Sequence, residues 1–194
     1  MKTNTNMTRG IFTAIIAFAL VAFSTGVEKK KVNVEKSTIK WTGEKLTGSH
    51  EGTINLLEGY FEMENGKLTG GEFTADMTSI NVTDLTAGNG KEKLEGHLNS
   101  DDFFGVKKYP TAKFVMTTVV EKSEGVYGVA GEMTIKGKTN PIAFDLKMNG
   151  DTAMTTLVID RSKYDIRYGS GSFFDNLGDK TIYDEFTLDI TLKM

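Results

Sequence analysis

The chain contains no cysteine, so disulfide bonds cannot contribute to its stability. Exported domains with a small core commonly depend on such bonds, and this one must rely on the burial of apolar side chains instead. Acidic residues outnumber basic ones by 26 to 23, which gives a net charge of −3. Because nucleic-acid binding needs a clustered basic surface, the composition argues against a nucleic-acid partner.

Residues suited to catalysis are also scarce. The two histidines, His50 and His97, do not stand in a spaced metal-binding motif, and a thiol nucleophile is excluded. The glycine–serine run 169–172 lacks the strand-to-helix context of a nucleophile elbow. Asp101 and Asp102 are adjacent, whereas a glycosidase needs two carboxylates that face each other across a bond. We therefore predict no catalytic residue and no metal site.

The first 26 residues have the order of a secretory signal peptide. Lys2 and Arg9 precede an apolar run of 13 residues from Ile11 to Phe23, and small residues follow it. The run is shorter than the stretch of about 20 apolar residues that spans a bilayer, although an uncleaved anchor stays open. We expect residues 1–26 to be removed and residues 27–194 to form one domain.

From Thr38 onward, apolar and polar residues alternate with a period of two. This pattern is typical of antiparallel strands with one wet face, as in Phe186, Leu188, Ile190 and Leu192. Dipeptides such as Asn65-Gly66, together with other Gly-containing turns, separate the runs and predict hairpins. We expect eight strands, near 38–47, 51–63, 67–78, 111–122, 125–136, 140–149, 151–160 and 182–193.

A long connection between the third and fourth strands predicts a short helical insertion near 85–104. Leu94 and Leu98 are four residues apart and would share one helix face. Ser100 before two acids resembles a helix start, with its hydroxyl as the cap. Phe103 and Phe104 would then close one end of the fold.

Eight antiparallel strands joined by hairpins avoid exposed edges by closing into a barrel. The class we predict is all-β, an eight-stranded antiparallel barrel. A barrel of this size either fills with side chains or holds one small ligand, and alternation alone leaves both open. We expect the apolar lining to include Phe61, Phe73, Phe103, Phe104, Phe114, Met116, Met133, Phe144, Met148, Phe173, Phe174 and Phe186.

Three polar residues are candidates for contact with a ligand head group: His50, His97 and Arg161. Arg161 follows an apolar strand, where a guanidinium could meet a phosphate or quinone oxygen at a cavity mouth. An ion pair with Asp160, with Asp165 or with a carboxylate on a neighbouring strand is the simpler interpretation and the one we favour.

Several motifs resemble one bacterial family. They are 37–41 (STIKW), 48–54 (GSHEGTI), 96–104 (GHLNSDDFF), 108–114 (KYPTAKF), 129–139 (VAGEMTIKGKT) and 159–166 (IDRSKYDI). In this order they resemble the YceI-like family of lipocalin-like, polyisoprenoid-binding proteins. Gly105 departs from the acidic residue that is common at that position, which affects a local turn and not the fold.

The resemblance implies a barrel with a tunnel-like apolar cavity, exported to the periplasm or beyond. It implies a polyisoprenoid, isoprenoid quinone or fatty-acid derivative as ligand, and a role as carrier or reservoir. No cofactor other than a bound lipid is expected, and at most transient contact with a membrane. Two alternatives stay open, an enzyme that acts on a lipid in the same cavity and an outer-membrane barrel. The resemblance does not specify the oligomeric state, and a dimer stays open.

Overall fold

The computed structural model describes residues 26–194, so most of the predicted signal peptide lies outside the described residues. This part of the chain forms nine strands, one α-helix and three short 3-10 turns. Their bounds are β1 (Glu28–Lys31), η1 (Val34–Lys36), β2 (Thr38–Lys45), β3 (Gly48–Glu64), β4 (Lys67–Val82), α1 (Lys91–Asn99), β5 (Thr111–Ser123), β6 (Val126–Ile135), β7 (Lys138–Asn149), β8 (Thr152–Asp160), η2 (Arg161–Tyr164), η3 (Gly178–Lys180) and β9 (Ile182–Lys193).

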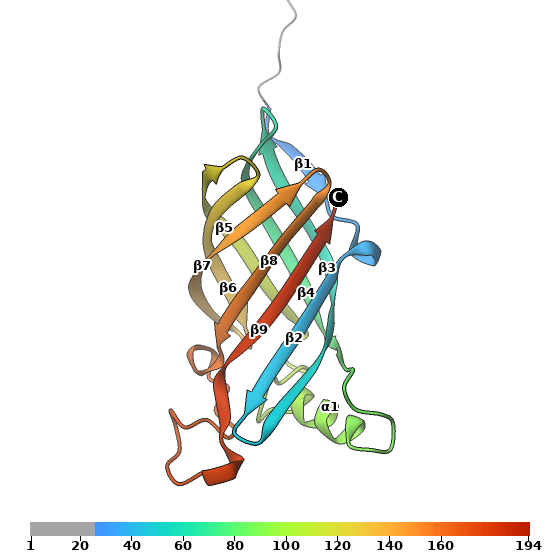
Figure 1. Cartoon of the computed structure of the whole chain (residues 1–194), viewed down its shortest axis with the longest axis vertical. Helices are drawn as coiled ribbons and strands as arrows, with labels where there is room; N and C mark the ends of the chain where they lie inside the picture. Colours follow the sequence, from blue (N-terminus) through green and yellow to red (C-terminus); the bar gives the residue numbers. More distant parts are fainter. Residues whose placement is uncertain (1–25) are drawn as a thin grey trace, which may run out of the picture.

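Strands β2 to β9 form a closed antiparallel barrel, seen from the side in Figure 1. Each strand pairs with its neighbours in the order β3-β2-β9-β8-β7-β6-β5-β4, and β4 pairs with β3 to complete the ring. β3 is the longest strand. Its first half pairs with β2, and its second half pairs with β1 through Tyr60–Met63. The predicted eight-stranded barrel is confirmed.

The sequence missed β1 and misplaced one helix boundary. β1 consists entirely of charged residues, so it carries no alternation that could reveal a strand. α1 covers nine residues inside the predicted insertion, but Ser100 stands at its C-terminal end and not at the start of a helix. The Ser100 N–H and hydroxyl both donate to the carbonyl of His97, so the serine caps the last turn. A serine–acid pair can follow a helix as well as begin one.

The two ends of the barrel differ. Three tight hairpin turns close one end, and the Asn65-Gly66 turn has positive φ values of 51° and 79°, as a two-residue hairpin of type I′ needs. The other end, lower in Figure 1, carries α1 and the long connection from β8 to β9. The helix of nine residues is too short to span a bilayer, and no other helix among the described residues could do so.

The ladder of paired residues between β7 and β8 is short. These strands share only three register pairs, Lys147–Asn149 with Thr152–Met154. Further along, the Thr155 hydroxyl donates to the carbonyl of Asp145, and the Asn140 side chain donates to the carbonyl of Lys163 in η2. Side chains and the η2 turn therefore replace the ladder where the two strands separate.

Gly131 lets β5 and β6 approach each other inside the barrel. A Cβ atom at this position would lie 2.2 Å from the carbonyl oxygen of Val115 and 2.6 Å from the Phe114 ring. Contact with a backbone oxygen cannot be relieved by a side-chain rotation. Gly43 on β2 is a strand glycine with nothing within 4 Å of such an atom.

We expect Gly131→Ala to lower the free energy of unfolding by about 1–3 kcal/mol, because the added methyl group overpacks the wall. Gly43→Ala is the matched control and should change it by less than about 0.5 kcal/mol. Urea unfolding followed by circular dichroism measures both. Equal effects of the two substitutions would contradict the close approach at Gly131.

Candidate functional site

The barrel encloses an apolar cavity of about 110 Å³, which we call the first chamber. Thr155 is the single polar residue among the described residues that line it. All eight barrel strands and Phe104 supply the lining, which is Ile39, Ile54, Leu56, Phe61, Phe73, Ala75, Met77, Phe104, Ala112, Phe114, Met116, Met133, Ile135, Phe144, Leu146, Thr155, Leu157, Phe186, Leu188, Ile190 and Leu192. An apolar cavity of this kind stays dry and accepts apolar guests.

A second chamber of about 70 Å³ lies toward the end of the barrel that carries α1. It shares three lining residues with the first chamber: Ile54, Phe104 and Phe186. The rings of Phe104 and Phe186 meet edge to face, with centroids 6.4 Å apart. These shared side chains divide the lumen. The rest of the lining is Trp41, Gly43, Glu44, Ile80, Leu98, Phe103, Arg161, Ile182, Tyr183 and Glu185.

The structure places most of the predicted lining residues at these chambers. Those at the first chamber are Phe61, Phe73, Phe114, Met116, Met133 and Phe144, while Phe104 and Phe186 border both, and Phe103 borders the second. Three others lie elsewhere in the described structure. Met148 packs at the margin of the core, and Phe173 and Phe174 are 39% and 50% exposed on the β8–β9 connection.

Aliphatic residues and Trp41 were missing from the predicted lining. Leu146, Leu157, Leu188 and Leu192 stand in the same alternating runs as the aromatic residues that were chosen. The period of two could therefore have found them. The prediction favoured large aromatic and methionine side chains and therefore left these leucines out.

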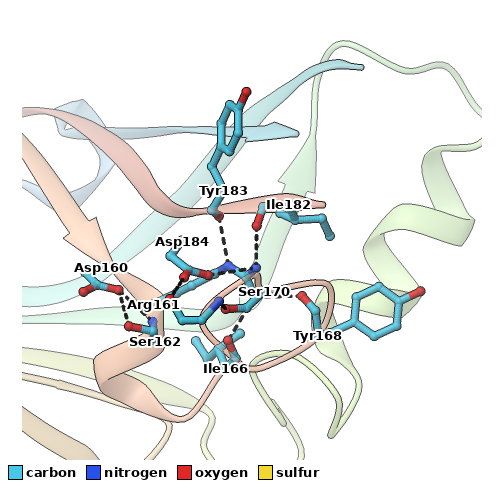
Figure 2. Close-up of polar contacts among 10 residues, drawn as sticks. Asp160, Arg161, Ser162, Ile166, Tyr168, Ser170, Ile182, Tyr183 and Asp184 are labelled. Atoms are coloured by element: carbon cyan, nitrogen blue, oxygen red, sulfur yellow. Dashed lines mark hydrogen bonds and ion pairs between the residues drawn. The ribbon is translucent and has the colours of Figure 1, made fainter. Parts of the chain in front are cut away.

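Arg161 is the best-satisfied polar group near the chambers, and it is only 2% exposed. Its guanidinium carries five N–H groups. Nε donates to the carbonyl of Tyr183 at 3.1 Å, Nη2 to Ile182 at 2.9 Å, and Nη1 to both Ile166 and Tyr168 at 2.9 Å (Figure 2). These carbonyls belong to the β8–β9 connection and to the start of β9.

Asp184 supplies the counter-charge. Its Oδ1 lies 3.3 Å from Arg161 Nη2, and its side chain is 19% exposed. Burial lowers the pKa of Arg161, and the Asp184 carboxylate acts in the opposite direction. An ion pair of this kind was the favoured interpretation of Arg161. Of the partners considered, the structure has the carboxylate on a neighbouring strand, Asp184 of β9, and not Asp160 or Asp165. The guanidinium fastens the β8–β9 connection to the barrel.

The two histidines lie outside both chambers. His50 Nδ1 is 2.7 Å from Asp84 Oδ2, and Asp84 Oδ1 accepts a hydrogen bond from the Glu51 N–H. Burial alone would raise the pKa of Asp84, but these two contacts outweigh it and lower the pKa. His97 packs edge to face on Tyr168, with centroids 4.1 Å apart. Within residues 26–194, no three metal-ligating side chains gather at one point.

Comparison with known proteins agrees with this geometry. A family model described as a YceI-like domain matches residues 31–194, which is most of the chain. The chain belongs to the YceI-like family.

Curated relatives include UPF0312 proteins of pseudomonads. One from Pseudomonas putida (strain W619) is 33% identical over 100 residues, which are 52% of this chain and 50% of the relative. One from Pseudomonas syringae pv. syringae is 35% identical over 105 residues, 53% of this chain and 54% of the relative. The aligned region thus spans about half the length of the curated relatives it matches.

Solved structures share the fold of this YceI-like chain. Burkholderia cenocepacia BcnA superposes with a TM-score of 0.65 at 23% identity, covering 83% of this chain and 98% of BcnA. A polyisoprenoid binding domain from Saccharophagus degradans gives 0.60 at 14% identity, covering 86% of this chain and 97% of that domain. At these identities the likeness establishes the fold alone.

We expect Arg161→Leu to destabilise this YceI-like barrel by about 3 kcal/mol or more, because it leaves Asp184 without its counter-charge and four carbonyls without donors. Arg167→Leu is the matched control, because Arg167 is an exposed arginine on the same connection. It should cost less than about 1 kcal/mol. Thermal unfolding and limited proteolysis of residues 162–181 measure the difference. Similar stability of the two variants would refute the structural role of Arg161.

Proposed function

We propose that the barrel binds one long apolar lipid in its lumen and serves as a carrier or reservoir for it. The candidate ligands are a polyisoprenoid, an isoprenoid quinone and a fatty-acid derivative. The observation that carries the proposal is the first chamber, a void bounded by apolar side chains with Thr155 as the single polar contributor among the described residues. Each methylene group transferred there from water contributes about 0.8 kcal/mol, so a hydrocarbon chain needs no specific polar contact to bind tightly.

The size of the chambers sets a condition on binding. Pockets for drug-sized ligands measure about 300–1,000 Å³, and the two chambers of about 110 and 70 Å³ are smaller. A long chain therefore requires the lining to move. Met77, Met116 and Met133 are suited to this, because methionine is unbranched and adapts its rotamers to irregular spaces. Displacement of Phe104 and Phe186 would join the chambers into one tunnel.

Two further observations support the ligand class and the place of action. The Saccharophagus degradans neighbour is described as a polyisoprenoid binding domain, on the same fold. Residues 1–26 have the order of a secretory signal peptide, which supports action in the periplasm or outside the cell. A carrier in an aqueous compartment has to shield a hydrocarbon from water, and a closed barrel with an apolar lumen provides that shield.

The arrangement of polar groups favours binding over catalysis. An enzyme acting on a lipid in the same cavity would need a reactive side chain at a chamber. His50 and His97 do not line either chamber, and four of the five Arg161 N–H groups are bonded to backbone carbonyls. The outer-membrane alternative is disfavoured, because charged residues such as Asp145 and Asp189 are exposed on the barrel while the first chamber is apolar. A membrane barrel has the opposite polarity.

Protein purified without denaturant should carry a hydrocarbon lipid, detected by mass spectrometry of an organic extract. Native mass spectrometry of the intact protein gives the stoichiometry, which we expect to be one lipid per barrel. Lipid-free protein that also takes up neither a polyprenol nor a fatty acid would defeat the proposal.

A ring placed in the lumen tests the binding site itself. Ala112 lines the first chamber on β5, so Ala112→Phe should reduce the lipid-bound fraction at least about fivefold by occupying the space of the ligand. Ala143→Phe on β7 is the matched control, because Ala143 is exposed on the outer face. Circular dichroism verifies that both variants fold. Equal lipid content in the two variants would place the ligand outside the lumen.

A further inference from the structure

The second chamber is where the end of a lumen-bound lipid would lie. It adjoins the first chamber through Ile54, Phe104 and Phe186, and it lies at the end of the barrel that carries α1. Its surface is apolar like that of the first chamber, but the residues that line it include Arg161, Trp41 and two glutamates. This inference rests on the proposed lipid binding and concerns the chemistry of the end group that the chamber accepts.

Arg161 is the one cation among the described residues that line this chamber, and most of its hydrogen-bonding capacity is already used. Four of its five N–H groups are within 2.9–3.1 Å of backbone carbonyls. Asp184 Oδ1 lies 3.3 Å from Nη2, and this carboxylate balances the charge. An arginine binds phosphate through free, parallel N–H donors. A phosphate in this chamber would therefore have to displace bonds that hold the β8–β9 connection.

The remaining charges at this chamber are negative. Glu44 on β2 and Glu185 on β9 both line it, and both are exposed at its margin. Arg161 and Asp184 cancel each other, so the uncompensated charge around the chamber is acidic. An anion moved from water into such a space loses its hydration without gaining a counter-ion. Carboxylate and phosphate end groups are disfavoured for the same reason.

Trp41 offers a hydrogen bond that the protein itself does not use. The indole lines the chamber, and its Nε1–H is buried without an acceptor among the described residues. The ring packs over Gly52, where a Cβ atom would lie 2.6 Å from Cζ2, so the wall is shaped to hold an indole. Buried donors in proteins are nearly always paired, and an unpaired one beside a cavity calls for an acceptor from a guest.

We propose that the second chamber selects an uncharged lipid end that carries a hydrogen-bond acceptor, such as a ketone, quinone or ether oxygen, and that this oxygen accepts from Trp41 Nε1–H. The nitrogen is covered in the structure. Contact therefore requires the lining side chains to move, as does the entry of any substantial group into a chamber of about 70 Å³. Of the proposed ligand classes, an isoprenoid quinone fits this description, whereas a polyprenyl phosphate and a free fatty acid do not.

The first test compares four ligands that share a farnesyl tail and differ at the end. The ends are a methyl ketone, a phosphate, a carboxylate and a plain hydrocarbon, each below its aggregation concentration. Trp41 is the sole tryptophan of the chain, so its emission reports on the chamber directly. Titration calorimetry provides the dissociation constants. We expect the ketone to bind at least about tenfold more tightly than either anion and to shift the emission to longer wavelength.

The outcomes separate this inference from the proposed function. Binding of the phosphate as tightly as the ketone would overturn the selection of a neutral end, while lipid binding in the lumen would stand. Failure of all four ligands, the plain hydrocarbon included, would count against the proposed function itself.

The second test removes the indole N–H and keeps an aromatic ring. Trp41→Phe should weaken ketone binding roughly threefold to tenfold, the size of one net hydrogen bond, and leave hydrocarbon binding within about twofold. Calorimetry is the readout, because this variant lacks the fluorophore, and thermal unfolding verifies that it folds. Equal losses for ketone and hydrocarbon would assign Trp41 to packing alone. The double variant Glu44→Gln, Glu185→Gln removes both negative charges at the chamber. It should bring the dissociation constants of the ketone and phosphate ligands closer together.

Discussion

The hydrogen bonds between β3 and β4 close the sheet, and the lumen depends on that closure. β3 pairs with β4 along nearly its whole length, with three register shifts that bend the strands. Because a closed sheet has no edge, its backbone groups are satisfied within the wall and its inward side chains can face only one another. Eight strands give an interior that side chains can fill or nearly fill. Here the filling is incomplete, and two apolar chambers remain.

The buried guanidinium of Arg161 holds the β8–β9 connection in place at the part of the wall where the strand ladder is incomplete. β7 and β8 separate beyond the Lys147–Met154 pair, and the connection from β8 to β9 has little regular structure of its own. By donating to carbonyls at both ends of this connection, Arg161 supplies hydrogen bonds that a strand ladder would otherwise provide. A buried charge is costly to desolvate unless it is paired and fully bonded. The same bonding makes four of the five Arg161 N–H groups unavailable to a ligand.

The sequence predicted the barrel because its dominant signal is a period of two. That period arises because alternate residues of each strand face the apolar lumen and the solvent. It did not predict β1, whose charged residues carry no such period, or the role of Ser100, because capping residues serve both helix ends. For the site, alternation placed most aromatic and methionine residues at the lumen. The carbonyl partners of Arg161 and the unpaired Trp41 N–H depend on the packing of distant segments, which no local pattern encodes.

In the proposed complex, the two ends of a bound lipid meet different surroundings. The first chamber offers only apolar area, so it cannot distinguish one hydrocarbon chain from another except by length and bulk. We therefore assign discrimination to the second chamber, where the buried Trp41 N–H lacks an acceptor. Phe104 and Phe186 stand between the two, and moving them forfeits ring contacts that only a ligand spanning both chambers can replace. A short guest would occupy the first chamber without losing those ring contacts. A long guest has to compensate for their loss by burying more apolar surface and by bonding through its polar end.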